Sequence, residues 1–177
     1  DGMHGVSPGP DGTGTNGTTA YPLSGCINKG LYGPCGPGEK KAANLHCVAC
    51  EAGTYSEGGE RFNCTSCEKG KYADTTGSSK CELCSIGKYG NVDRAHSNAS
   101  CTACPEGKFN SFPGASECQQ CPPGSKCYKQ GMDQGEQCAR GAYALSTGST
   151  SCSSCAIGSY QSSPGQAVCK ECPVGKY

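Results

Sequence analysis

Cysteine pairs recur along this chain at a fixed interval, and this recurrence limits what the chain can fold into. The pairs have the form Cys-x-x-Cys, and they begin at Cys47, Cys64, Cys81, Cys101, Cys118, Cys152 and Cys169. Most intervals are 17 residues; the one before Cys101 is 20, and the one before Cys152 is 34, which is two periods. A fixed period of this kind predicts an array of repeats, with one variant unit between Cys118 and Cys152.

A second pattern has the same period as the cysteines. Three residues after the last cysteine of a pair comes Gly-x-aromatic, and the aromatics are Tyr55, Tyr72, Tyr89, Phe109, Tyr143, Tyr160 and Tyr177. Another glycine stands four residues before several closing cysteines, at Gly77, Gly114, Gly148 and Gly165. Glycine permits tight turns, so each unit is predicted to be a hairpin of two short strands that ends at the next cysteine.

The chain has too few large apolar residues to fold around a hydrophobic core. Leu, Ile, Val and Phe together number 16 of 177 residues, a composition typical of disorder. The 18 cysteines reverse that expectation, because cross-links can replace a core. The predicted fold class is therefore small disulfide-rich β, an elongated tandem array of about 17-residue cysteine-rich repeats with little helix. Each unit is expected to touch mainly its neighbours.

Charge and hydropathy exclude two classes of partner. The formal net charge is +0 and the Lys and Arg residues are scattered, so no nucleic acid is expected. No apolar run is long enough for a membrane span in this segment. No signal peptide is visible, and because cysteines oxidise outside the cytosol, the numbered chain is expected to start after a removed signal or inside a longer protein.

The combined pattern resembles a known repeat. The run Cys-x-x-Cys-x-x-Gly-x-Tyr followed by Gly-x-x-x-Cys-x-x-Cys resembles the ephrin-receptor-like (GCC2/GCC3-type) cysteine-rich repeat, and it is similar to the first module of TNF-receptor-like cysteine-rich domains. The resemblance extends from Cys47 to Tyr177, departs from the pattern at Cys121–Cys127 and is poor over residues 1–46. It implies extracellular rods of stacked disulfide loops and no catalytic residues, so no enzyme is expected.

The resemblance also implies the disulfide pairs, which spacing alone does not determine. In this family pattern the second cysteine of one pair bonds the first of the next. The implied pairs are Cys50–Cys64, Cys67–Cys81, Cys84–Cys101, Cys104–Cys118, Cys138–Cys152 and Cys155–Cys169, with Cys121–Cys127 for the variant unit and Cys35–Cys47 at the N-terminal side. Cys26 and Cys172 then have no partner within the chain. Zinc binding by the cysteine pairs is the alternative, because their spacing lies in or near the zinc-ribbon range.

The same patterns divide the chain into segments. Residues 1–25 form a Gly/Thr/Ser/Pro-rich linker or assembly arm, and residues 26–46 form a cysteine-containing cap. Regular repeats follow over 47–121, a variant repeat over 122–138, and regular repeats that stop in mid-repeat over 139–177.

Three Asn-x-Ser/Thr sequons, at Asn16, Asn63 and Asn98, predict surface sites for N-linked glycans. The recurring aromatics have two interpretations: packing on a disulfide or the next unit, or a row of platforms for sugar rings. The match of Gly5–Gly9 to a Gly-x-Ser-x-Gly nucleophile motif lacks the preceding apolar strand and is taken as coincidence. His4, His46 and His96 form no metal or catalytic set, and no metal or cofactor is expected apart from covalent glycans.

These observations favour an extracellular or cell-surface structural protein. The leading hypothesis is a subunit of a glycosylated fibril, filament or mastigoneme-like appendage, whose partners are homo-oligomeric neighbours and glycans. The alternative is a receptor or adhesion ectodomain in which the repeats form a stalk or a ligand-binding face.

Overall fold

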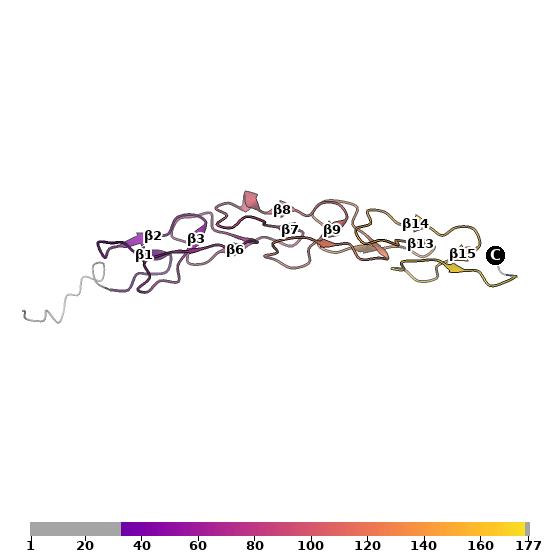
Figure 1. Ribbon diagram of the computed structural model, residues 1–177, viewed down its shortest axis with the longest axis horizontal. Coiled ribbons are helices and arrows are strands. Elements are labelled where there is room, and N and C mark those ends of the chain that lie inside the picture. Colours follow the sequence, from indigo (N-terminus) through magenta and orange to yellow (C-terminus); the bar gives the residue numbers. More distant parts are fainter. Residues whose placement is uncertain (1–32, 176–177) are drawn as a thin grey trace, which may run out of the picture.

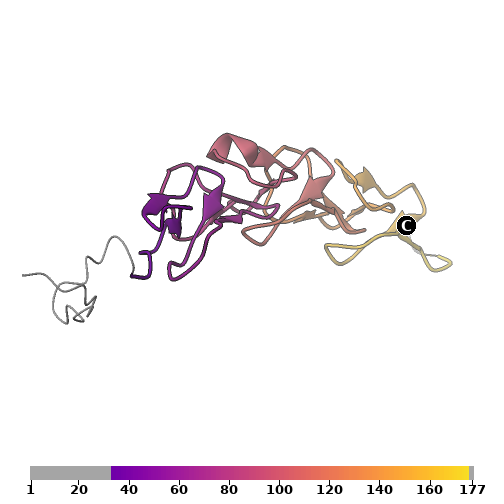
Figure 2. The ribbon, with the colours of Figure 1, turned by 60° about the vertical axis from the view of Figure 1, so that its left-hand side comes forward.

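The protein is an elongated rod in which the units follow one another in sequence order. The computed structural model describes residues 33–175, and the units run from the indigo end to the yellow end in both views (Figures 1 and 2). Cys26, Asn16, His4, the Gly5–Gly9 motif and the predicted arm of residues 1–25 lie outside the described residues.

Each unit contains one antiparallel hairpin of two short strands. Strands that are consecutive in the chain pair with each other, which gives eight two-stranded sheets. The strands are β1 (Glu39–Lys41), β2 (Cys47–Ala49), β3 (Thr54–Tyr55), β4 (Thr65–Ser66), β5 (Lys71–Tyr72), β6 (Glu82–Leu83), β7 (Lys88–Tyr89), β8 (Thr102–Ala103), β9 (Lys108–Phe109), β10 (Gln119–Gln120), β11 (Ser125–Lys126), β12 (Glu136–Gln137), β13 (Ala142–Tyr143), β14 (Ser153–Ser154), β15 (Ser159–Tyr160) and β16 (Lys170–Glu171).

Helix is almost absent from the part of the chain that the structure describes. One short 3-10 helix there, η1 (Asn98–Ser100), occupies the extra residues of the longest unit and stands out from the rod (Figure 1). No helix among residues 33–175 is long or apolar enough to cross a membrane. The predicted fold class, an elongated array of small disulfide-rich β units, is confirmed.

Within residues 33–175, eight disulfides divide the rod into units. The structure joins the same cysteine pairs that the family resemblance implies. We number the units in chain order. Seven are bounded by their disulfides: unit 1 (35–47), unit 2 (50–64), unit 3 (67–81), unit 4 (84–101), unit 5 (104–118), unit 7 (138–152) and unit 8 (155–169). Unit 6 extends over residues 121–135, and its disulfide joins Cys121 to Cys127. Unit 1 is a repeat of the same geometry, although its sequence matches the pattern poorly, because Gly38 forms the same turn and β1 pairs with β2.

The core of the rod is sulfur rather than hydrocarbon. Seven of the eight largest fully buried side chains are cysteines: Cys50, Cys67, Cys84, Cys104, Cys121, Cys127 and Cys138. A closed loop of about 15 residues stabilises the folded chain by about 3 kcal/mol in the chain-entropy model. Cross-links therefore take the place of the apolar core that the composition cannot supply.

Neighbouring units are joined by a repeated set of three backbone hydrogen bonds. Between units 3 and 4, the Gly70 N–H donates to the Gly90 carbonyl (2.8 Å), the Ala73 N–H to the Ala95 carbonyl (3.0 Å), and the Arg94 N–H to the Cys67 carbonyl (2.7 Å). Equivalent bonds recur between units 5 and 6, where Gly107, Asn110 and Gly131 are the donors. The hairpins thus stack in one fixed register.

Units 1 to 6 each also contact the unit two positions further along. The sequence predicted contacts mainly between adjacent units. Gly70 of unit 3 lies so close to unit 5 that a Cβ on it would stand 2.1 Å from the Gly114 carbonyl oxygen. The glycines after the cysteine pairs of units 1, 2, 4, 5 and 6 meet the turn of the unit two further along in the same way. Each unit is therefore held by four others wherever the rod extends far enough.

Candidate interaction surface

Six of the eight described units present one aromatic ring, whereas unit 1 has Lys40 and unit 6 has Lys126 at the same place. Tyr55, Tyr72, Tyr89, Phe109 and Tyr143 are half-buried, and Tyr160 is exposed. Phe109 of unit 5 packs against Cys121, Cys127 and Met132 of unit 6. This contact supports the interpretation that the rings pack on the next unit, while their outer faces line the surface.

The residue after the aromatic, or after the lysine that replaces it in units 1 and 6, is buried in every described unit, and we call it the core position. Its occupants are Lys41, Ser56, Ala73, Gly90, Asn110, Cys127, Ala144 and Gln161. Polar occupants find internal partners: Asn110 Nδ2 donates to the Lys88 and Phe112 carbonyls, and Gln161 Nε2 donates to the Val168 carbonyl. Lys41 forms an ion pair with Glu60 of the next unit. The repeat pattern alone did not predict this position, although its fixed place in the repeat was a usable signal.

The core position explains the variant unit. A Cβ built on Gly90 would stand 3.2 Å from Cys84 Sγ, so side chains at the core position face the disulfide of their own unit. In unit 6 that side chain is Cys127, which bonds Cys121 directly. Gly135 occupies the place of the missing closing cysteine, and a Cβ there would stand 2.9 Å from Cys121 Sγ. Unit 6 thus keeps the repeat backbone while its disulfide partner has moved.

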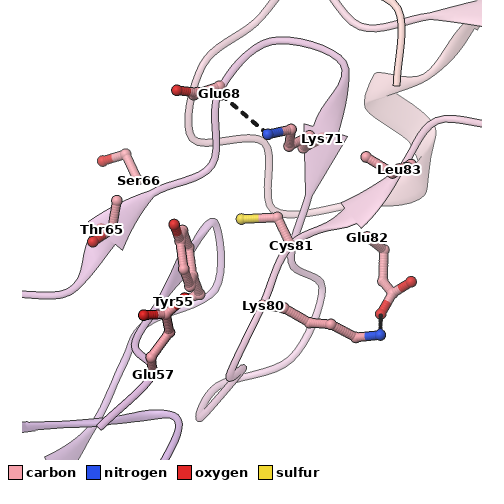
Figure 3. Close-up of a pocket in the computed structure, with 10 residues that line it drawn as sticks. All are labelled: Tyr55, Glu57, Thr65, Ser66, Glu68, Lys71, Lys80, Cys81, Glu82 and Leu83. Carbon is pink, nitrogen blue, oxygen red and sulfur yellow. Dashed lines mark hydrogen bonds and ion pairs between the residues drawn. The ribbon is translucent and has the colours of Figure 1, made fainter. Parts of the chain in front are cut away.

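One groove lies where units 2 and 3 meet, and it is open to solvent. Its volume is about 680 Å³, and it is lined by Tyr55, Glu57, Thr65, Ser66, Glu68, Lys71, Lys80, Cys81, Glu82 and Leu83. Strands β3 to β6 carry most of these residues. Figure 3 shows the Tyr55 ring on one side of the groove and the Cys81 sulfur near its centre.

Ion pairs flank this groove. Lys71 Nζ lies 3.1 Å from Glu68 Oε2, and Lys80 Nζ lies 3.7 Å from Glu82 Oε1 (Figure 3). These side chains are exposed, so each pair contributes at most about 1 kcal/mol. The Cys81 sulfur is bonded to Cys67, and it is therefore not a free nucleophile. The arrangement suits weak polar contact with a neighbouring molecule rather than bond-making chemistry.

A second groove, of about 450 Å³, lies between units 4 and 6. Its lining includes Ile86 on one side and Tyr128, Lys129 and Met132 on the other. It follows from the contact between second neighbours, because Ile86 lies one residue before Gly87, which meets the turn at Gly131.

The sequons at Asn63 and Asn98 lie at the surface, and the one at Asn16 lies outside the described residues. Asn63 is exposed in the bend before β4, and Asn98 is exposed at the first residue of η1, which Ser97 caps through a bond to the Ala99 N–H. Both positions leave room for a glycan.

The cysteines that could have bound zinc are engaged otherwise. Sixteen of them form the eight disulfides, so they have no thiolate to offer a metal. Cys172 has no bonded partner among the described residues. His46 and His96 are exposed on different units.

A family model described as "Tyrosine-protein kinase ephrin type A/B receptor-like" matches the chain three times, over residues 53–101, 70–121 and 141–177. Together these matches cover more than half of the chain. The chain belongs to the ephrin-receptor-like family. The stretch between the matches, residues 122–140, contains most of variant unit 6, whose cysteine pairing departs from the ephrin-receptor-like pattern.

A search of the curated proteins found no match to the chain. The ephrin-receptor-like repeats and the disulfides indicate an extracellular or cell-surface module of receptor-like or structural type that interacts with proteins, in a family that is not a known enzyme class.

Proposed function

We propose that this chain is a structural rod outside the cell, a subunit of a glycosylated fibril or surface appendage of the mastigoneme-like kind. Its repeats set a fixed length and direction, and its exposed grooves contact neighbouring subunits.

One observation carries the proposal: the units are locked to first and second neighbours. Three backbone hydrogen bonds join each adjacent pair, and glycine contacts such as that between Gly70 and Gly114 join alternate units. A chain with contacts to nearest neighbours alone can bend at every junction. Contacts between alternate units oppose such bending. A filament that must keep its shape under force requires this stiffness.

The lateral surface of the rod suits weak association with other copies of this chain or with other proteins. The groove of units 2 and 3 offers an aromatic ring flanked by both charge signs, through Tyr55, Lys71 and Glu82. Exposed apolar residues, among them Phe112 (67% exposed) and Leu145 (64%), add scattered contact points. Glycans on Asn63 and Asn98 would keep part of this surface free of contact.

The family description supports a second candidate, a receptor or adhesion ectodomain in which the rod is a stalk. The two functions differ in whether copies of the chain associate. A stalk stays monomeric in solution, whereas a fibril subunit forms repeated contacts along an axis.

The deciding experiment is to secrete the full chain from a eukaryotic host and to measure its association. Sedimentation velocity across a concentration series and negative-stain electron microscopy should show concentration-dependent assemblies with a regular axial repeat. A monomer at all concentrations, with single rods in the images, would refute the fibril and favour the stalk.

A further inference from the structure

The disulfide map contains one long gap. Between consecutive disulfides the chain has only two residues outside any loop, as in Thr65–Ser66 or Gln119–Gln120. The gap after Cys127 is different, because no disulfide between described residues spans residues 128–137. This gap exists because Cys121 bonds Cys127 instead of a residue at position 135.

The gap has a consequence for the whole chain. A backbone cut inside any regular loop leaves the two sides joined through the disulfide that closes the loop. A cut within residues 128–137 leaves the two halves of the rod with no covalent connection. The two-residue gaps are poor sites for a backbone cut, because each lies in a strand that is paired in a hairpin.

The gap is also accessible at its start. Tyr128, Lys129 and Gln130 are exposed, and Tyr128 is 45% exposed. None of these three residues exchanges a backbone hydrogen bond with any residue between 33 and 175, whereas the following turn is held by Gly131 and Met132. Exposed, unbonded loop segments are the preferred sites of proteolytic nicking.

The chemistry of the segment points to one class of enzyme. Between Cys35 and Cys172, the basic residues outside the disulfide loops are Lys129 and Lys170. Lys170 is in β16 and is paired with Tyr160 in the hairpin of unit 8. Lys129 lies outside any strand, in the sixth of the eight described units.

We propose that the Lys129–Gln130 peptide bond is a processing site for an endoprotease that cleaves after basic residues. Water hydrolyses this bond, its hydroxyl going to the Lys129 carbonyl carbon and its hydrogen to the Gln130 nitrogen. The cut converts a continuous covalent rod into two segments that only non-covalent contacts hold together. Those contacts include the Cys127 N–H bond to the Ser149 carbonyl and the Gly124 N–H bond to the Ala144 carbonyl.

The proposal is tested by limited digestion of the full oxidised chain with trypsin, followed by denaturing gels without and with reducing agent. The non-reducing gel should show two fragments, and the smaller should begin Gln130-Gly131-Met132 on N-terminal sequencing. Lys129→Gln should abolish the split. Lys108→Gln, a matched change inside the loop of unit 5, should leave it unchanged.

A second variant tests the disulfide argument itself. Cys127→Ser with Gly135→Cys should restore the regular pairing, since Gly135 does not have a positive φ and a Cβ there would stand 2.9 Å from Cys121 Sγ. After digestion this variant should run as one species without reducing agent and as two with it.

Two results would overturn the proposal. One is a digest of the wild-type chain that stays a single species on the non-reducing gel. The other is a split that persists in Lys129→Gln, because the cut would then lie elsewhere. Both concern chains that keep all native cysteines, so the test stands even if the disulfide variant fails to fold.

Discussion

In units 1 to 6, the glycine three residues after the opening cysteine meets two separate constraints. Its φ is positive, at +81° for Gly70, which L side chains adopt at a cost of about 1–2 kcal/mol. Its Cα also faces the backbone of the unit two further along, with no room for a Cβ. The first constraint belongs to the hairpin and is local. The second belongs to the stack and depends on the array.

A pair of substitutions separates these constraints. Gly141 has the same backbone conformation (φ +76°), but nothing within 4 Å would meet a Cβ on it. We expect Gly141→Ala to cost about 1–2 kcal/mol. Gly70→Ala should cost about 1–3 kcal/mol more, because it must also push the Gly114 carbonyl away. Urea unfolding of the oxidised proteins measures both. Equal losses would show that the second-neighbour contact carries no energy.

The sequons give a prediction at the same scale. We expect Asn63 and Asn98 to carry glycans when the chain is secreted from a eukaryotic cell, since both are exposed. Asn98→Gln and Ser100→Ala should each remove the same single glycan, seen as a mass loss that equals the effect of enzymatic deglycosylation at that site. Asn91→Gln, at an exposed asparagine outside any sequon, should leave the mass of the glycoforms unchanged apart from the substitution. Unmodified Asn63 and Asn98 in the secreted chain would contradict the prediction.

At the scale of the hairpin, the short strands contribute little by themselves. Most are two residues long, and an isolated two-stranded hairpin is marginal in water. The hairpins persist because a disulfide closes each regular loop, and in unit 5 the aromatic ring also packs on the next unit. Phe109 shows this packing against Cys121 and Cys127.

Two phenylalanines of unit 5 test the packing. Phe109 is half-buried against unit 6, whereas Phe112 is 67% exposed. We expect Phe109→Ala to destabilise units 5 and 6 by about 0.8–1.5 kcal/mol, half of the value for a fully buried ring. Hydrogen exchange at the Asn110 N–H, which bonds the Met132 carbonyl, should accelerate. Phe112→Ala should leave that amide unchanged, and similar exchange in the two variants would contradict the packing.

The sequence predicted the hairpins well because their determinants are local. The spacing of Cys50, Gly53 and Tyr55 defines a turn and a strand without reference to the rest of the chain. The sequence did not reveal that unit 1 belongs to the array, since Lys40 stands where the aromatic is expected. It also did not reveal the role of Gly135, because only the fold shows that this residue faces the Cys121 sulfur.

The sequence also did not predict the groove of units 2 and 3. It depends on how two hairpins stack, and stacking follows from hydrogen bonds between positions such as Gly53 and Ala73 that no local pattern marks. A repeat pattern therefore identifies the elements and their order, while the surface between elements requires the structure.

For the whole molecule, the disulfides decide how force passes along the rod. Under tension the load follows the shortest covalent path, so the residues inside a closed loop are bypassed by its disulfide. Each regular unit therefore adds only a short linker to the loaded chain. Unit 6 adds residues 128–137 as well, which makes it the place where an oxidised rod can lengthen.

Single-molecule stretching of the oxidised chain measures this difference directly. Relative to Cys127→Ser with Gly135→Cys, the wild-type chain has eight more residues in its load path, from 127 to 135. At roughly 3.3–3.6 Å per extended residue, its fully stretched length should be greater by about 28 Å. Reducing agent should abolish the difference, since every loop then opens in both proteins. Equal lengths under oxidising conditions would mean that a disulfide spans the gap, and unit 6 would then resist tension like any other unit.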